Sequence, residues 1–185
     1  MRRILKTSVL IGFGLPTISF AADGLDVDFT ANILATTCTI TIVQDGGPKV
    51  NADGGDNYSL TIASVGLDKI VTGNTLAQAN FKLVASGCSS GYQKIYTKLS
   101  GASISGKLIK NEATTSAAAN IGMGIKLRDT ADSAFITPNN TFSIEWSADN
   151  KANGLPLTVA LRETTAGMGN TGTFRAKATF NFTYE

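Results

Sequence analysis

The sequence predicts an all-β protein. Short apolar runs rich in Thr, Val, Ile and Phe are separated by clusters of Gly, Asn, Asp and Ser, as in strands joined by turns. Apolar and polar residues alternate strictly near both ends of the chain, and long helical patterns are few. We therefore expect strands at residues 25–43, 58–62, 79–87, 93–99, 122–128, 142–146, 157–163 and 173–184.

Residues 1–21 have the layout of a secretory signal peptide. Three basic residues precede an apolar run at residues 9–15 and a break at Pro16. Ser19 and Ala21 supply the small residues needed before the cleavage site, so we place the cut after Ala21. A membrane anchor is the alternative, but about 20 consecutive apolar residues are needed to span a bilayer, and this run is shorter.

Removal of this leader leaves 164 residues, a length suited to one domain with a sizeable core. It also removes three of the 16 basic residues, which leaves 13 against 14 acidic residues and a net charge near −1. Nucleic-acid binding depends on clustered positive charge, so the composition gives no support for a nucleic-acid partner.

The two cysteines, Cys38 and Cys88, both lie in the mature part of the chain. An exported chain with one such pair normally bridges it in an oxidising compartment, and we expect one disulfide. A metal or redox pair is the weaker reading, because the sequence has no histidine and no C-x-x-C spacing.

Each end of the mature chain carries a segment with one apolar face. The apolar residues near the C-terminus alternate with Arg, Lys, Thr and Asn, and they are Phe174, Ala176, Ala178, Phe180, Phe182 and Tyr184. Those near the N-terminus alternate with Asp, Thr and Asn, and they are Leu25, Val27, Phe29, Ala31 and Ile33. Such alternation is also the rule for ordinary half-buried strands, so it does not by itself separate a free N-terminal extension from an internal strand.

Several catalytic and binding signals are weak. Residues 167–172 match the dinucleotide fingerprint G-x-G-x-x-G, but an alternating strand follows instead of the required helix, which favours a hairpin loop. Residues 111–120 lack an apolar stripe and favour a loop. Trp146 is expected in the core, not at a sugar-binding surface. Without histidine, and with its acidic residues in turns, the chain offers no acid–base site, and we expect neither an enzyme nor a cofactor.

Four segments make the sequence resemble subunits of bacterial pili assembled by the chaperone–usher pathway. Residues 27–38 (V-D-F-T-A-N-I-L-A-T-T-C) resemble the N-terminal extension and first strand of that family, and residues 81–88 (F-K-L-V-A-S-G-C) its second cysteine strand. Residues 124–129 (G-I-K-L-R-D) are similar to a mid-domain strand. In the most specific match, Gly172 stands fourteenth from the end and Tyr184 is penultimate.

This resemblance implies an incomplete immunoglobulin-like β-sandwich that lacks its seventh strand and carries an N-terminal donor-strand extension. The expected parts are a signal peptide at residues 1–21, the donor strand at residues 22–33 and the pilin domain at residues 34–185. The donor residues would be Leu25, Val27, Phe29, Ala31 and Ile33. The acceptor groove and chaperone-binding strand would comprise Gly172, Phe174, Ala176, Ala178, Phe180, Phe182 and Tyr184.

The function implied is that of a structural subunit of a fimbria, exported through the periplasm to the cell surface and supporting cell adhesion. Its partners would be a periplasmic chaperone, an outer-membrane usher and neighbouring pilin subunits, with a host receptor contacted through the fibre. The chaperone would anchor the C-terminal carboxylate of Glu185. Ala31 departs from the family pattern, which has glycine there. A one-domain tip adhesin that binds a host glycan or protein is the alternative function.

Overall fold

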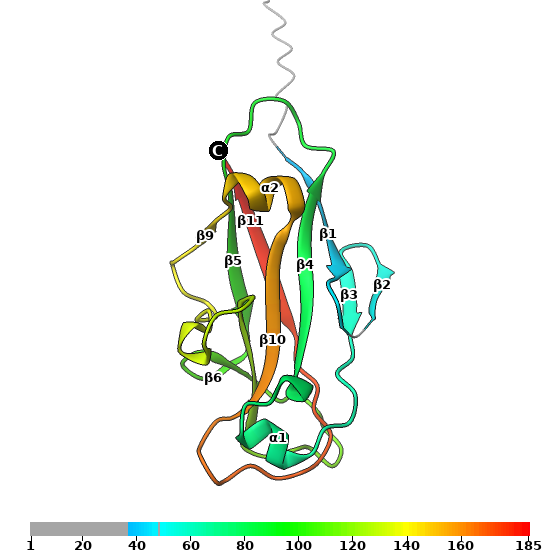
Figure 1. The fold of residues 1–185 in the computed structure, drawn as a ribbon, viewed down its shortest axis with the longest axis vertical. Helices are drawn as coiled ribbons and strands as arrows, with labels where there is room; N and C mark the ends of the chain where they lie inside the picture. Colours follow the sequence, from blue (N-terminus) through cyan, green and yellow to red (C-terminus); the bar gives the residue numbers. More distant parts are fainter. Residues whose placement is uncertain (1–36, 48) are drawn as a thin grey trace, which may run out of the picture. The chain divides into compact units, whose positions relative to one another are not determined.

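The computed structural model describes residues 37–47 and 49–185. Its largest sheet has the strand order β1-β4-β10-β8-β7-β6, and neighbouring strands are antiparallel throughout. Its strands are β1 (Thr39–Gln44), β4 (Gln78–Ser86), β10 (Leu155–Glu163), β8 (Ile121–Leu127), β7 (Leu108–Lys110) and β6 (Ser103–Ser105). Strands β1, β4, β10 and β6 of this sheet are labelled in Figure 1.

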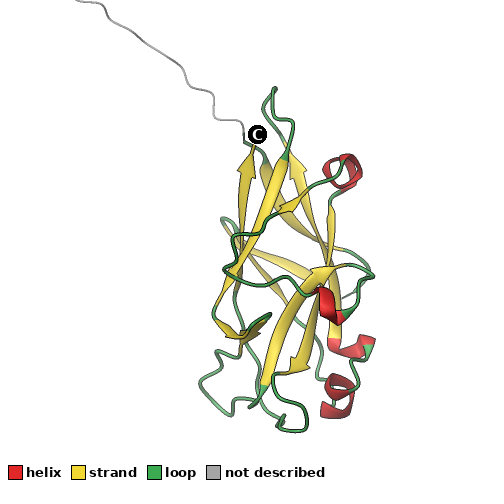
Figure 2. Cartoon of the chain, turned by 90° about the vertical axis from the view of Figure 1, so that its left-hand side faces the viewer, coloured by secondary structure: helices red, strands yellow, loops and turns green. Residues whose placement is uncertain are grey.

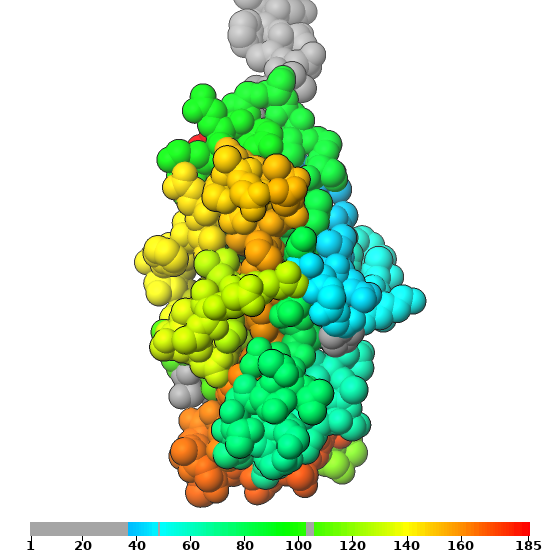
Figure 3. Space-filling model, in the orientation of Figure 1, coloured from blue at the N-terminus to red at the C-terminus, as the bar shows by residue number. Residues whose placement is uncertain are grey.

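A second sheet has the order β11-β5-β9 and is also antiparallel. It consists of β11 (Ala178–Tyr184), β5 (Ile95–Gly101) and β9 (Ile144–Glu145). A separate two-stranded sheet joins β2 (Val50–Gly54) to β3 (Asn57–Leu60). This hairpin stands out beside β1 on the cyan side of the surface in Figure 3.

Four short helical segments occupy the connections between strands. They are α1 (Leu67–Val71), η1 (Thr75–Ala77), η2 (Asp132–Ala134) and α2 (Ala148–Asn153). The hydroxyl of Ser147 accepts a hydrogen bond from the Asn150 N–H (3.1 Å) and so caps α2, and Gly154 ends it with a φ of 89°. No helix in the part of the chain that the structure describes is long and apolar enough to cross a membrane.

The two larger sheets pack face to face and share one hydrophobic core (Figure 2). Phe81 of β4 meets Phe180 of β11 with ring centroids 6.0 Å apart. Trp146 is 2% exposed, and its Nε1–H donates to the Thr97 hydroxyl at 2.7 Å. The prediction that Trp146 belongs to the core is therefore confirmed.

A cluster of charges covers the face of the large sheet that is turned away from this core. Asp132 of η2 accepts hydrogen bonds from Arg162 Nε (2.6 Å) and Lys126 Nζ (2.9 Å). Burial alone would raise the pKa of Asp132, but the hydrogen bonds from Arg162 and Lys126 outweigh it and hold the pKa below its usual value. The cluster fixes η2 on β8 and β10. The Phe135 ring, which follows η2, packs directly on Gly124 of β8. Any larger residue at position 124 would collide with it, because a Cβ would lie 2.6 Å from the ring.

The structure confirms most of the expected strands and corrects several. The expected strand at residues 142–146 is reduced to β9, and β2 forms at residues 50–54, where no strand was expected. Regular pairing of the C-terminal strand with β5 begins only at Ala178, because residues 173–175 bond instead to the 111–118 loop. The loop at residues 167–172 is confirmed, but it lies between strands of two different sheets and is not a hairpin loop.

The features predicted for the N-terminal segment lie outside the described residues. They are the signal peptide at residues 1–21, the donor strand at residues 22–33 and its side chains Leu25, Val27, Phe29, Ala31 and Ile33. Of the expected strand at residues 25–43, the structure describes the part from residue 37 onward, and β1 begins there at Thr39.

Candidate strand-acceptor groove

An apolar groove of about 820 Å³ opens between the two sheets. Its floor is the inner face of the large sheet, with Phe81, Met123, Ile125 and Val159 among its residues. One wall is the C-terminal segment, which contributes alternate residues because successive side chains of an extended chain point to opposite faces. These residues are Phe174, Ala176, Ala178 and Phe180, with Gly172 at one end, and the polar residues Thr173 and Arg175 also border the groove there.

The opposite wall is formed by the chain between β2 and α1. Tyr58, Leu60 and Ile62 line the groove there, together with residues 63–65 and Leu67. These three apolar residues alternate within the strand expected at residues 58–62, so the signal was present in the sequence. Alternation shows that a face is buried, but not which segment lies opposite, and this wall was therefore missed.

Three segments that border the groove, β11, β1 and residues 61–65, carry backbone groups without a neighbouring strand in the described part of the chain. There β11 pairs only with β5, and β1 pairs only with β4. Residues 61–65 take part in no backbone hydrogen bond within the described ranges. An open sheet edge next to exposed apolar residues is a template for another strand. The groove therefore offers hydrogen-bonding edges and an apolar floor to the same extended segment.

Phe182 and Tyr184 of β11 lie beyond the lining of the groove. The ring of Phe182 packs edge-on against Trp146 with centroids 6.5 Å apart. The Tyr184 hydroxyl donates to the Cys38 carbonyl at 3.3 Å, and burial raises the pKa of this tyrosine. The seven residues expected along the acceptor strand thus divide into five that line the groove and two that close the sandwich beside it.

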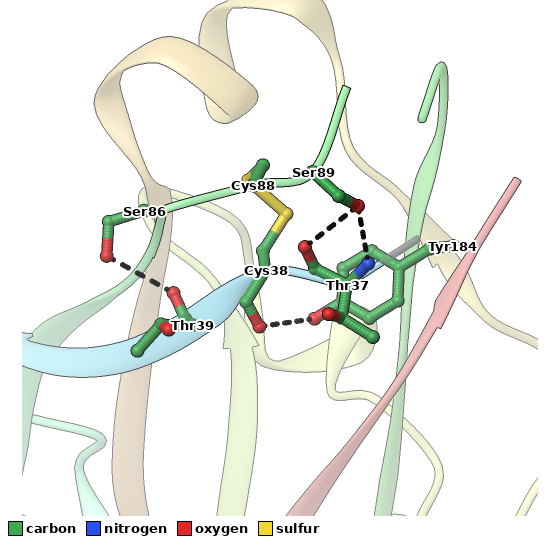
Figure 4. The surroundings of a disulfide bond; sticks show 7 residues. All are labelled: Thr37, Cys38, Thr39, Ser86, Cys88, Ser89 and Tyr184. Atoms are coloured by element: carbon green, nitrogen blue, oxygen red, sulfur yellow. Dashed lines mark hydrogen bonds between the residues drawn. A yellow bond between two sulfur atoms is a disulfide. The ribbon is translucent and has the colours of Figure 1, made fainter. Parts of the chain in front are cut away.

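The disulfide between Cys38 and Cys88 fixes the end of the sandwich at which β11 finishes (Figure 4). It joins the residue before β1 to the residues that follow β4. Next to it, the Thr37 N–H donates to the Ser89 hydroxyl at 3.0 Å, and the Ser89 N–H donates to the Thr37 carbonyl at 3.0 Å. The expected disulfide is present and ties the start of the described chain to the end of β4, while the hydrogen bond from Tyr184 to Cys38 places it beside the end of β11.

The other end of the C-terminal segment is held by contacts that the sequence did not reveal. The Asn111 side chain donates to the carbonyls of Ala118 (2.9 Å) and Thr173 (2.8 Å), and its Oδ1 accepts from the Arg175 N–H (3.0 Å). Gly172 packs on the same loop, where a Cβ would collide with the Ser116 carbonyl oxygen. Glycine is required there for close backbone approach.

The main-chain oxygen of Glu185, which we expected a chaperone to anchor, accepts two hydrogen bonds within this chain. The donors are the N–H groups of Gln93 (2.5 Å) and Lys94 (2.7 Å).

In the described residues, no group of three or more His, Cys, Asp or Glu side chains is placed to hold a metal ion.

Comparison with known proteins decides the family. The sequence pattern described as fimbrial protein matches residues 27–185, which cover every strand of the fold. The chain belongs to the fimbrial protein family. Fimbrial proteins are constituents of surface fimbriae, and the match extends N-terminally beyond the described residues into the expected donor strand.

Two known proteins resemble this fimbrial chain over nearly its whole length. It is 50% identical to the uncharacterised fimbrial-like protein YadM of Escherichia coli strain K12, over 97% of this chain and 96% of that protein. The crystal structure of the P pilus rod subunit PapA aligns with a TM-score of 0.54, over 86% of this chain and 100% of that one. The two share 14% sequence identity, so the likeness concerns the fold: the fimbrial chain is an all-β, immunoglobulin-like sandwich of the pilin type.

Proposed function

We propose that this fimbrial chain is a structural subunit that polymerises by strand exchange. The groove of one subunit receives the N-terminal segment, residues 22–33, of the next. The observation that carries the proposal is the apolar groove of about 820 Å³ between two edges that lack a strand in the described part of the chain. Adhesion is then a property of the assembled fibre, and the subunit itself performs no catalysis.

The N-terminal segment has the chemistry that the groove requires. Its alternate residues Leu25, Val27, Phe29, Ala31 and Ile33 form one apolar face. Four of these are large, and burial stabilises each by about 1.5–3 kcal/mol, so the contact is worth about 6–12 kcal/mol before the cost of ordering the chains. Main-chain hydrogen bonds to the open edges add to this, as in other complexes formed by strand addition.

The open groove also explains why the proposal includes assembly factors. A subunit with an uncovered edge and apolar floor is prone to aggregate. A periplasmic chaperone would cover the groove after export, and an outer-membrane usher would exchange it for the N-terminal segment of the next subunit. Ala31 brings a methyl group to a point where glycine would allow closer backbone approach, which would favour acceptor grooves with space at that position.

The test is a strand-complementation experiment. The mature chain without residues 22–33 is mixed with a peptide that copies residues 23–34, or carries that copy fused to its C-terminus, and its melting temperature is measured. We expect the truncated chain to aggregate alone and the peptide or the fusion to raise its melting temperature by tens of degrees. A stable truncated monomer that ignores the peptide would contradict strand exchange.

Two altered peptides provide matched controls. Phe29→Asp places a charge on the apolar face, and Thr30→Asp adds the same charge to the opposite face. The first peptide should lose its effect, because a carboxylate cannot be buried in the apolar groove without a partner. The second should retain most of it. Equal behaviour of the two peptides would show that binding does not depend on the face presented to the groove.

A further inference from the structure

Large apolar side chains are exposed at one end of the sandwich. Val71 of α1, Leu76 of η1 and Met168 are 53%, 65% and 57% exposed, and they are half of the exposed large apolar residues in the described part of the chain. Figure 1 shows α1 and the loop at residues 164–172 together at the end opposite the C-terminus. We call these three residues the α1-end patch. A gathering of exposed apolar side chains on one surface marks an interaction site.

The groove runs to the same end of the sandwich. Leu67 and Ile70 of α1 line it, and so do residues 170–172, which follow the loop that carries Met168. Strand β4 leads from this end to the disulfide, because it begins directly after η1 and ends two residues before Cys88. Its nine residues span about 26 Å at about 3.3 Å per step. The patch therefore borders one mouth of the groove, and the disulfide lies at the far end.

The linker between the expected donor strand and the disulfide is short. Ile33 and Cys38 are separated by 38 − 33 = 5 residue steps, which span at most about 18 Å at about 3.6 Å per step. When one subunit donates its segment, its disulfide end therefore lies close to whichever end of the acceptor groove holds Ile33. The direction of the donated segment decides which end that is.

A donated segment parallel to β11 would crowd the disulfide ends together. Because β11 finishes beside Cys38, Ile33 would lie at the acceptor's disulfide end, and each subunit of a fibre would hold its disulfide end beside those of both neighbours. A compact domain of about 150 residues has a radius of gyration of about 15 Å and is about 38 Å across, about twice the reach of the linker, so consecutive subunits would overlap. An antiparallel segment instead places Ile33 at the α1 end of the acceptor, with the disulfide end of the next subunit directly beyond it.

Leu34 breaks the alternation of the N-terminal segment at this junction. The outer face of the segment otherwise consists of Asp26, Asp28, Thr30 and Asn32. Leu34 follows them on that face, directly after Ile33, at which the apolar donor face ends. In a donated strand its side chain would point away from the groove floor, because successive side chains point to opposite faces. In the antiparallel alignment it leaves the groove at the α1 end, where the patch is exposed.

We propose that the α1 end of one subunit and the disulfide end of the next form a second contact in the fibre, in which Leu34 of the incoming chain packs on the α1-end patch. This inference rests on the proposed function, because the donated segment is what brings the two ends together. The contact continues from the mouth of the groove but lies outside it. It therefore makes a whole subunit bind more tightly than a free strand with the same donor residues.

A pair of full mature chains that can join only once tests this proposal. The donor chain carries a C-terminal copy of residues 23–34, which fills its own groove. The acceptor chain carries Phe29→Asp, which prevents it from donating its own segment. The two chains are refolded together, and the rate at which the acceptor releases a fluorescently labelled donor is measured. A labelled peptide copying residues 23–33, which lacks Leu34, is measured on the same acceptor.

Val71→Ser in the acceptor is the test variant, and Val43→Ser is its matched control. Val43 is also an exposed valine, but it lies beside Lys82, midway along β4. Full burial of a large apolar side chain shifts an equilibrium by about 10- to 150-fold, and about half of Val71 remains to be buried. Val71→Ser should therefore speed release of the donor chain by about 3- to 12-fold, and Val43→Ser should not. Neither variant should change release of the peptide, because neither side chain lines the groove.

Leu34→Ser in the donor chain tests the other side of the same contact. It should also speed release from the wild-type patch by about 3-fold or more. Combined with Val71→Ser in the acceptor, it should speed release by less than the product of the two separate factors, because both variants remove one shared contact. Fully multiplicative effects would show that Leu34 does not pack on the patch.

The two measurements separate failure of this contact from failure of strand exchange. Equal release of the donor chain from acceptors with the wild-type patch, Val71→Ser and Val43→Ser would overturn the second contact alone. Faster release of the peptide from the Val71→Ser acceptor, by the same factor as the donor chain, would also overturn it, because the substitution would then act through the groove. If the acceptor with a wild-type patch binds neither the donor chain nor the peptide, the proposed function itself fails.

Discussion

The hydroxyl of Tyr184 donates a hydrogen bond to the carbonyl of Cys38 at 3.3 Å, which connects the end of β11 to the start of β1 across the two sheets. Neither strand pairs with the other, so this contact and the core between them hold the two edges of the groove at a fixed separation.

Tyr184→Phe should lower the free energy of unfolding by about 0.5–1.5 kcal/mol, the usual net value of one such hydrogen bond. Urea unfolding of the strand-complemented subunit measures it. Tyr58→Phe is the control, because Tyr58 lines the groove and its hydroxyl has no hydrogen-bond partner among the described residues. Equal losses in the two variants would show that the bond to Cys38 contributes nothing specific.

Replacing both Cys38 and Cys88 by alanine should destabilise the domain by about 4 kcal/mol, because the bridge closes a loop with a sequence separation of 50 residues. The measurement is denaturant unfolding of the double variant beside the oxidised wild type. Wild-type protein kept reduced should behave like the variant. A loss below about 1 kcal/mol would mean that the unfolded chain gains little freedom when the bridge is absent.

Acid should weaken the domain partly through Asp132. Its pKa is lower in the folded chain than in the unfolded one, so its contribution to stability is full above the unfolded value of about 3.9. The contribution is lost as the pH falls through the lower folded value. Asp132→Asn should therefore reduce the stability near neutral pH and flatten its decline between about pH 5 and pH 2, followed by urea midpoints at each pH.

At neutral pH the Asp132→Asn variant should lose about 1–3 kcal/mol, because Lys126 and Arg162 keep their buried positions without a carboxylate partner. Asp129→Asn is the matched control. Asp129 forms no ion pair in the part of the chain that the structure describes, and its φ of 61° is one that asparagine tolerates. An unchanged pH profile in Asp132→Asn would contradict the role of this cluster.

Gly172→Ala should cost more stability than Gly167→Ala, although both glycines have positive φ values of 153° and 72°. The backbone conformation alone costs alanine about 1–2 kcal/mol. At Gly172 the added methyl group also collides with the backbone at Ser116 and Ala118, whereas nothing lies within 4 Å of it at Gly167. Thermal unfolding of both variants, each complemented by the same peptide, gives the comparison. Equal losses of stability in the two variants would show that the 111–118 loop moves to accommodate the methyl group without a free-energy cost.

The sequence predicted the parts of this fold that local patterns determine. Alternation and β-branched residues identified the central strands β4, β8 and β10, and the absence of a helical stripe identified the loop at residues 111–120. Strand β3 was expected within residues 58–62, but its partner β2 was missed, because Asp53 and Gly54 have turn chemistry and Gly54 pairs with Asn57 across the hairpin. The helices α1 and α2 have five and six residues, too few to show a periodic apolar face.

Only one of the two walls of the candidate groove could be predicted from the sequence. The alternation from Phe174 to Tyr184 identified one wall of the groove, but it could not show that the lining ends at Phe180 and that Phe182 turns to Trp146. Likewise, Asn111 is an ordinary loop residue until the fold brings it beside Thr173 and Arg175. These features depend on contacts between residues that lie far apart in the sequence, by more than 60 positions for the bonds of Asn111 to Thr173 and Arg175.

Because β11 is the last strand in chain order, it is also the last strand to be synthesised. A ribosome and an export channel deliver residues from the N-terminus onward, so the segment expected to be donated emerges first and β11, the wall of its receptor, emerges last. If subunits join by the proposed strand exchange, the receiving surface is complete only when synthesis ends. A nascent chain would then be able to offer a strand long before it could accept one, and premature coupling between incomplete chains would have nothing to bind.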